Sequence, residues 1–162
     1  MMPYYQPEPH ILGWLRNFIL PNDVILDVGS GDGRHRDIGG RRYISLDSWP
    51  AAQPDYLMDL NERDLPRVKA SVVLMSDVLE HLPRDRGLEV LGQAQRLTSR
   101  AVVVLTPLAW DENREAYDEG FYQGNENVLH KSLWDLRDFH PGWVRVWLPS
   151  TLDNFFGYWI KQ

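Results

Sequence analysis

An apolar strand that runs directly into three closely spaced glycines is the feature that most constrains how this chain folds. Residues 24–33 read VILDVGSGDG, so a short apolar run reaches Asp27 and then Gly29, Gly31 and Gly33. Glycine permits tight turns, and because it has no Cβ it lets a ligand approach the backbone closely. In open α/β sheets, ligands bind just beyond the carboxyl ends of the strands. The segment therefore predicts a ligand-binding loop at the end of a buried strand.

The spacing of the glycines distinguishes two classes of nucleotide-binding loop. The dinucleotide fingerprint is G-x-G-x-x-G/A, and its last position here is Arg34, which disfavours a nicotinamide oxidoreductase. The chain has G-x-G-x-G instead, at Gly29, Gly31 and Gly33. This pattern resembles motif I of the class I S-adenosylmethionine (SAM)-dependent methyltransferases. Further motifs follow in the order of that family, so the resemblance covers roughly residues 24–146.

Apolar runs alternate along the chain with segments of helical periodicity, a pattern typical of α/β proteins. The expected helices cover residues 9–19, 84–97 and 132–139, the last with Ser132 as its N-cap. The expected strands cover residues 24–28, 43–46, 55–58, 71–75, 101–106, 143–148 and 154–160. On the helix at 84–97, a spacing of three marks the expected core residues Leu88, Leu91, Ala94 and Leu97. Strands that alternate with helices imply a mainly parallel sheet.

The first crossover connections are too short to hold full helices. Residues 34–42 separate the glycine loop from the next strand, and they include Gly39 and Gly40. The sequence therefore predicts a single domain over residues 1–162, with an α/β, Rossmann-like three-layer sandwich fold. Its mainly parallel sheet would have about seven strands, with the last strand antiparallel and the early crossover helices shortened.

Composition narrows the classes of partner. The formal net charge of −6 disfavours nucleic acid, because phosphate binding needs a basic footprint. Without cysteine, the chain has no disulfide, thiol nucleophile or thiolate metal site. The first residues do not resemble a signal peptide, and no apolar run approaches the ~18 residues of a membrane span. We therefore expect a cytoplasmic protein without a membrane partner, and the oligomeric state is left open.

The family resemblance implies a set of cofactor contacts at the ends of the early strands. In that family the glycine loop wraps the amino-acid end of SAM, and an acidic residue after the second strand binds the ribose. A carboxylate at that place can accept both ribose hydroxyls, as in dinucleotide-binding folds. In the same family, an Asp that follows the third strand and the backbone N–H of the next residue contact the adenine. Carried over to this sequence, the cofactor-binding residues are Asp27, Gly29, Ser30, Gly31, Asp47, Ser48, Asp59, Leu60 and Ser76.

A second group of polar residues follows the strand expected at 71–75. Asp77, Glu80 and His81 stand at i, i+3 and i+4, which on a helical turn would point them the same way. Three interpretations stay open. The group is a structural helix start, or Asp77 or His81 acts as a general base on a substrate hydroxyl, or the group binds a divalent metal. The pattern is similar to the E-x-x-E-H of metal-assisted methyltransferases that act on polyprenyl catechols and small-RNA 3′ ends, with Asp in its first position.

Residues 107–131 form a long polar and aromatic stretch with little periodicity, and such loops are usually functional or mobile. Residues 125–143, which overlap the end of this stretch, resemble small bacterial and phage "type 11" methyltransferases, with His130, Ser132 and Trp134 matching. The resemblance implies one of two roles for His130. Its side chain reaches into the acceptor pocket, or it takes the place of the further metal-binding His that the RNA enzymes have. The alternative is that His130 caps or packs the helix start. An aromatic roof over the substrate is expected from Tyr4, Tyr5, Trp110, Tyr117, Phe121 and Tyr122.

The resemblance implies methyl transfer from SAM to a small-molecule or glycan acceptor, most simply at oxygen. The candidate catalytic residues are Asp77, His81 and His130. Since the sulfonium is already electrophilic, the protein need only align the reactants, exclude water and remove a proton. Two alternatives remain: a SAM-binding protein without turnover, and a metal-assisted RNA 2′-O-methyltransferase.

Overall fold

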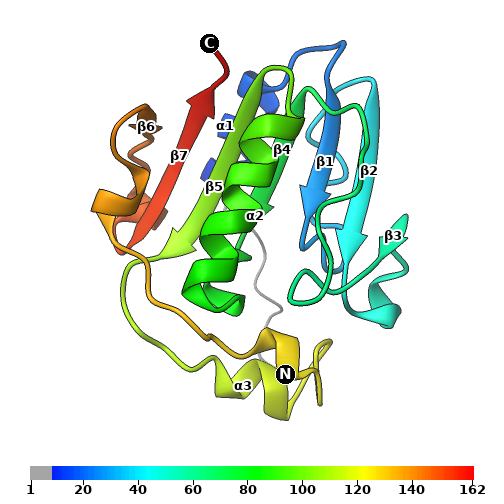
Figure 1. Ribbon diagram of the computed structural model, residues 1–162, viewed down its shortest axis with the longest axis vertical. Helices are drawn as coiled ribbons and strands as arrows, with labels where there is room; N and C mark the ends of the chain where they lie inside the picture. The colour runs from blue at the N-terminus through cyan, green and yellow to red at the C-terminus, as the bar shows by residue number, and fades with distance from the viewer. Residues whose placement is uncertain (1–8) are drawn as a thin grey trace.

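A seven-stranded sheet forms the centre of the computed structural model, which describes residues 9–162 (Figure 1). Its strand order is β3-β2-β1-β4-β5-β7-β6. The strands are β1 (Val24–Val28), β2 (Arg42–Asp47), β3 (Tyr56–Leu57), β4 (Val72–Ser76), β5 (Ala101–Pro107), β6 (Trp143–Arg145) and β7 (Asn154–Ile160). β1 to β5 pair in parallel, and β7 runs antiparallel to both of its neighbours. The expected α/β fold with a mainly parallel sheet is confirmed.

Helices cover the two faces of the sheet, as Figure 1 shows with α2 in front and α1 behind. α1 (Pro9–Phe18) packs on alternate strand residues such as Ile25 and Val103, and these belong to one apolar core. α2 (Arg84–Leu97) packs on the intervening residues, such as Leu26 and Val102, in the second core. Because successive side chains of a strand point to opposite faces, the central strands are apolar at nearly every position.

The shortened crossovers predicted from the sequence are confirmed. Residues 31–37 between β1 and β2 form a series of turns rather than a helix. His35 and Ile38 from this connection are each 1% exposed, so their side chains occupy space that a crossover helix would otherwise cover. The connection from β2 to β3 contains only the 3₁₀ turn Pro50–Ala52.

Two local predictions in the second half of the chain are wrong. Leu88 of α2 is 43% exposed, so its assignment to the core is wrong. Leu91 and Ala94 are buried as predicted, and Leu97 is partly buried against the same core. A strict spacing of three drifts around a helix of 3.6 residues per turn, so the predicted stripe turns away from the sheet at Leu88, where Gly87 and Val90 face the core instead.

The helix expected at 132–139 is reduced to the 3₁₀ turn Leu136–Phe139, and its N-cap is Asp135 rather than Ser132. Ser132 is buried, donates its hydroxyl to the carbonyl of Leu79 and accepts a hydrogen bond from Trp134 Nε1. Its hydroxyl therefore joins this segment to the core instead of capping a helix. The remaining helical segments are α3 (Arg114–Asp118) and the 3₁₀ turns Leu79–His81, Glu126–Val128 and Pro149–Thr151.

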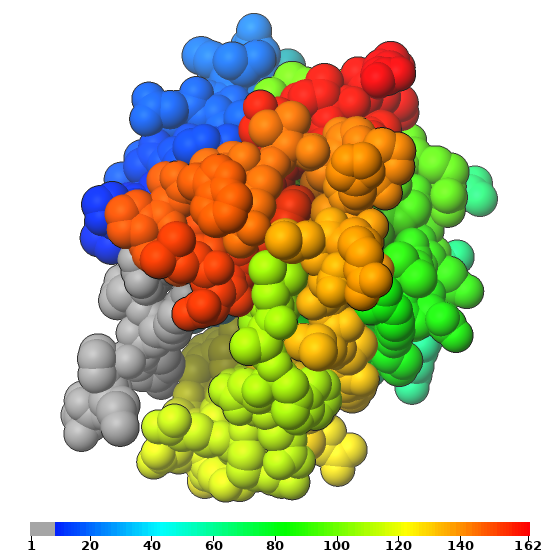
Figure 2. Space-filling model, turned by 90° about the vertical axis from the view of Figure 1, so that its left-hand side faces the viewer, coloured from blue at the N-terminus to red at the C-terminus, as the bar shows by residue number. Residues whose placement is uncertain are grey.

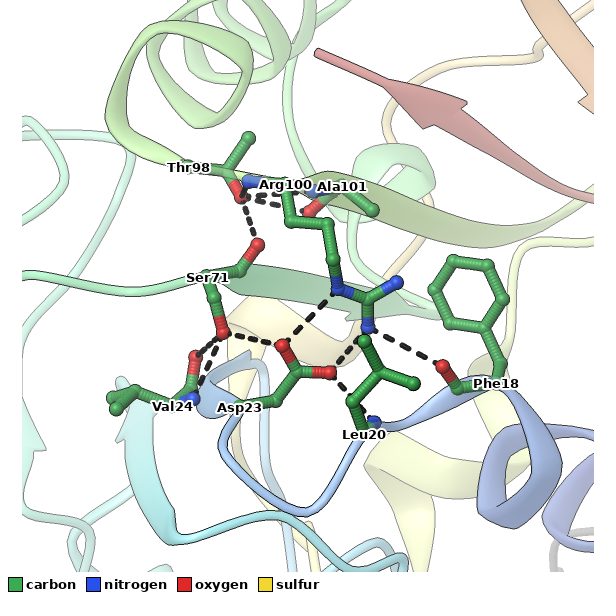
Figure 3. Close-up of polar contacts among 8 residues, drawn as sticks. All are labelled: Phe18, Leu20, Asp23, Val24, Ser71, Thr98, Arg100 and Ala101. Carbon is green, nitrogen blue, oxygen red and sulfur yellow. Dashed lines mark hydrogen bonds and ion pairs between the residues drawn. The ribbon is translucent and has the colours of Figure 1, made fainter.

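An ion pair connects the amino ends of the central strands, at the end of the sheet opposite the glycine loop. Figure 3 shows its two residues, Asp23 and Arg100. Asp23, just before β1, pairs with Arg100, just before β5, and accepts hydrogen bonds from the Leu20 N–H and the Ser71 hydroxyl. Burial alone would raise the pKa of Asp23, but Arg100 and the other donors outweigh it and lower that pKa. The ionised carboxylate therefore links α1, β1, β4 and β5.

No helix within residues 9–162 combines the length and apolar character that crossing a membrane requires.

Candidate functional site

The glycine loop follows β1 and adopts backbone conformations that suit glycine. Gly29, Gly31 and Gly33 have φ values of 69°, 52° and 83°. A Cβ on Gly29 would lie 2.6 Å from Val78 Cγ2, and one on Gly31 would collide with the hydroxyl of Tyr122. Both conformation and space therefore require glycine at positions 29 and 31.

Asp47 fastens this loop to the end of β2. One carboxylate oxygen accepts a hydrogen bond of 2.8 Å from the Gly31 N–H, and the other accepts one of 2.8 Å from the Trp49 N–H. Burial raises the pKa of Asp47, although these N–H groups stabilise the charged form. The carboxylate predicted to bind ribose thus lies directly beside the glycine loop, and each oxygen has a further lone pair. The preceding loop residue, Ser30, is 1% exposed.

Asp27 lies beneath the loop and is 1% exposed. Its Oδ2 accepts a hydrogen bond from the Tyr43 hydroxyl and lies 3.3 Å from His35 Nδ1. Its Oδ1 is buried and has no hydrogen-bond partner among the described residues. Sequence reasoning missed His35 and Tyr43, because no motif marks them and only the folded connection brings them under the loop.

The segment predicted to contact adenosine is held at the end of β3. Asp59 accepts hydrogen bonds from the backbone and side-chain nitrogens of Asn61, and from Asn127 Nδ2 at 3.0 Å. Burial alone would raise the pKa of Asp59, but these donors outweigh it and lower that pKa. Asn127 Nδ2 also lies 3.3 Å from Ser48 Oγ, so one side chain contacts two of the predicted cofactor residues. Leu60 is buried.

Asp77 follows β4 in the left-handed region of backbone conformation, with φ 54°. A non-glycine residue in that region stores strain, which occurs often at functional sites. The carboxylate lies 3.7 Å from Arg34 and 3.4 Å from the hydroxyl of buried Ser76. Burial raises the pKa of Asp77, and the Arg34 guanidinium opposes that rise. The prediction that Asp77 shares a regular helical turn with Glu80 and His81 is wrong, since the turn begins at Leu79.

Glu80, His81 and His130 form a compact cluster. One potential ligand atom from each lies within 4.8 Å of the others. Glu80 is 1% exposed and accepts a hydrogen bond of 3.0 Å from the Thr106 hydroxyl. The rings of His81 and His130 meet edge to face, with centroids 4.9 Å apart. The structure therefore brings His130 beside two residues that precede it by about 50 positions in the sequence.

Burial sets the protonation of this cluster. It raises the pKa of Glu80 well above its usual value, helped by the Asp77 charge. Burial and the neighbouring His130 lower the pKa of His81 to about 4, and burial lowers the pKa of His130 as well. Burial therefore favours the protonated form of the Glu80 carboxyl group, and it favours the uncharged form of both imidazoles. His81 Nδ1 lies 3.4 Å from the Leu129 carbonyl, which can only accept, so this contact favours the tautomer with the proton on Nδ1.

The aromatic residues expected to cover the substrate lie in different surroundings. The Tyr122 hydroxyl lies against Gly31 of the glycine loop, and the Phe121 carbonyl accepts a hydrogen bond from Nε1 of Trp49, which follows β2. Trp110 is 57% exposed, and Tyr117 packs under the guanidinium of Arg114. Tyr4 and Tyr5 lie outside the described residues.

Comparison with protein families and with curated proteins finds no match to this sequence. Several solved structures are similar in fold. One is magnesium protoporphyrin IX methyltransferase from Synechocystis PCC 6803 with S-adenosylhomocysteine (SAH) bound. It gives a TM-score of 0.61 at 14% identity, over 94% of this chain and 80% of that one. The N-methyltransferase NodS from Bradyrhizobium japonicum WM9 gives 0.60 at 12% identity, over 95% of this chain and 96% of that one.

A third similar structure is an O-methyltransferase family protein from Burkholderia thailandensis. It gives a TM-score of 0.57 at 13% identity and covers 94% of this chain and 55% of that one. The chain therefore has the fold of the class I SAM-dependent methyltransferases. At these identities the likeness establishes the fold, and the function rests on the site.

Proposed function

We propose that this chain transfers a methyl group from SAM to an oxygen atom of a small molecule or a glycan. The observation that carries the proposal is the bare backbone of Gly29 and Gly31 at the carboxyl edge of a methyltransferase-type sheet. The Synechocystis enzyme of the same fold was crystallised with SAM and with SAH.

The chemistry of the residues fits this cofactor. Asp47 offers two carboxylate oxygens for the ribose hydroxyls, and Asp59 offers an acceptor for the adenine amine. The Oδ1 of Asp27, which has no hydrogen-bond partner among residues 9–162, offers a further acceptor under the loop for the ammonium group of SAM. The other residues assigned to the cofactor in this proposal are Gly29, Ser30, Gly31, Ser48, Leu60 and Ser76.

SAM, when bound, supplies an electrophilic methyl group, so the chain itself must position the acceptor and remove its proton. His81 is the proposed base, because burial favours its uncharged ring and the contact with the Leu129 carbonyl favours a lone pair on Nε2. Asp77, held in a strained conformation after β4, and His130, packed on His81, are proposed to line the acceptor side.

The Glu80–His81–His130 cluster favours a second candidate, methyl transfer assisted by a divalent metal. One carboxylate oxygen and two imidazole nitrogens suit a borderline cation, and the neutral imidazoles are ready to donate. A cation would bind the ionised form of Glu80, which burial disfavours, so affinity for the cation would rise with pH. A bound cation there would act as a Lewis acid on the acceptor oxygen.

Incubation with methyl-labelled SAM separates these possibilities. The purified protein is given pools of small metabolites, glycans and RNA, each with and without a chelator. We expect label in the metabolite or glycan pool. Label that appears only in RNA and disappears with chelator would establish the metal-assisted RNA activity. If SAH binds but no pool is labelled, the chain is a binding protein without turnover.

A further inference from the structure

The segment Gly120–Asn127, here called the covering segment, lies against residues that the proposed function assigns to the cofactor. It belongs to the connection between β5 and β6, which passes below the carboxyl ends of the parallel strands in Figure 1. In Figure 2 the yellow and yellow-green residues of this connection make up the lower end of the molecule. The sheet therefore presents its proposed binding edge to the chain's own loop.

The first contact is between Tyr122 and the glycine loop. The Tyr122 hydroxyl occupies the position that a Cβ on Gly31 would need, so it lies against the bare backbone there. Burial and the charge of Asp47 raise the pKa of Tyr122 to about 12, so the phenol is neutral and sits near the carboxylate proposed for ribose. A cofactor in contact with Gly31 requires the same space.

The second contact is between Asn127 and the residues proposed for adenosine. Its amide nitrogen donates to Asp59 Oδ2 at 3.0 Å and lies 3.3 Å from Ser48 Oγ. An amide NH₂ that faces Asp59 offers the same donor as the exocyclic amine of adenine. A third contact fixes the backbone, since Trp49 Nε1 donates to the Phe121 carbonyl at 2.9 Å.

The covering segment also has the means to move. Gly120 and Gly124 flank Phe121–Gln123 with φ values of 87° and 75°, and a Cβ on either would meet nothing within 4 Å. Glycine is therefore favoured at these two positions by backbone conformation and not by lack of space. Two such residues on either side of a short segment can act as its hinges. Asn125 caps the 3₁₀ turn Glu126–Val128 by accepting a hydrogen bond from the Asn127 N–H, so the turn that carries Asn127 is ordered within the segment itself.

We propose that the covering segment occupies the cofactor site in the resting protein, with Tyr122 and Asn127 in place of parts of SAM, so that SAM binds only when the segment swings away. This inference rests on the proposed function, because it needs the glycine loop, Ser48 and Asp59 to be the cofactor site. The segment thereby controls both the affinity and the rate of cofactor entry.

Titration with SAH, a stable product of the proposed reaction, tests the inference. Asn127→Ala and Tyr122→Ala each remove a competing contact, so SAH should bind about five- to tenfold more tightly and associate faster than with the wild type. Gln123→Ala is the matched control, because this exposed side chain of the same segment bonds only to the Asp118 carbonyl. Its affinity for SAH should equal that of the wild type.

Hydrogen exchange of the unmodified protein provides a second measurement that needs no variant. Exchange in residues 120–127 should increase when SAH is added, because the ligand displaces the segment. Slower exchange with SAH, or weaker SAH binding by Asn127→Ala and Tyr122→Ala, would mean that the segment closes over the ligand, and would overturn the inference. Unchanged SAH affinity in both variants would overturn it as well. If neither the wild type nor the variants bind SAH, the proposed function fails, and the inference fails with it.

Discussion

The backbone N–H of Gly31 donates a 2.8 Å hydrogen bond to the carboxylate of Asp47, which joins the loop after β1 to the end of β2. Gly31 thus allows the loop to turn, while Asp47 presents its carboxylate beside the loop. Asp47 is buried but keeps acceptor capacity beyond the bonds to Gly31 and Trp49. This pair is the core of the proposed cofactor site.

Replacing Asp47 tests that assignment. Asp47→Asn removes the charge and one of the two acceptor oxygens, so SAH affinity should fall about tenfold or more, measured by calorimetry. Asp37→Asn, an exposed carboxylate on the connection between β1 and β2, is the control and should bind as the wild type does. Equal SAH affinities for the two variants would remove Asp47 from the site.

His81 should affect turnover and not cofactor binding. Once an acceptor is found, His81→Ala is expected to slow methyl transfer by about 10²-fold or more while leaving the dissociation constant of SAH unchanged. His10→Asn, an exposed histidine on α1, is the matched control. Unchanged turnover in His81→Ala would show that His81 is not the base.

Gly87 is expected to be required for packing. A Cβ there would lie 2.6 Å from Trp134 Cζ2, whose ring is fully buried, so Gly87→Ala should lower the free energy of unfolding by about 1–3 kcal/mol. In the same helix, a Cβ on Gly92 would meet only the flexible end of Arg96. Gly92→Ala should therefore be neutral or stabilising by about 0.5–1 kcal/mol. Urea unfolding of both variants checks this, and equal destabilisation would contradict the packing argument.

The pair of Asp23 and Arg100 should make stability depend on pH. Arg100→Gln should cost about 2 kcal/mol at neutral pH, because it leaves a buried carboxylate without its charged partner. The folded-state pKa of Asp23 lies below its unfolded value of 3.8, so the contribution is present above that pH. It is lost as the pH falls through the lower, folded-state pKa.

Urea unfolding at a series of pH values measures this difference between the wild type and Arg100→Gln. The gap in unfolding free energy should be constant near neutrality and shrink at acid pH. Arg41→Gln, at an exposed arginine just before β2, should show no such gap. A gap that persists unchanged below the unfolded pKa of Asp23 would contradict the ionic origin of the stabilisation.

Local signals made much of the fold predictable. The apolar run before Gly29 and the alternation of strands with helices determine the sheet, and the short connection at 34–42 predicts the missing crossover helix. These features depend on residues close together in sequence. The register of α2 was mispredicted at Leu88, because which face meets the sheet depends on the partner strands and on Trp134.

The residues beneath the glycine loop, and the segment that covers it, are positioned by contacts that sequence spacing does not reveal. His35 reaches Asp27 only because the connection folds beneath the loop without a helix. Asn127 and Asp59 are 68 residues apart, and the segment between β5 and β6 has no periodicity from which its path could be inferred. The positions of the motifs could therefore be predicted, but not what covers them.

Calorimetric titration with SAH is the measurement that tests the central claim most directly. We expect saturable binding in the micromolar range by the wild type, tighter binding by Asn127→Ala, and a marked loss of affinity in Asp47→Asn. No heat and no thermal shift with SAM or SAH, in either the wild type or Asn127→Ala, would contradict the assignment of this site to SAM.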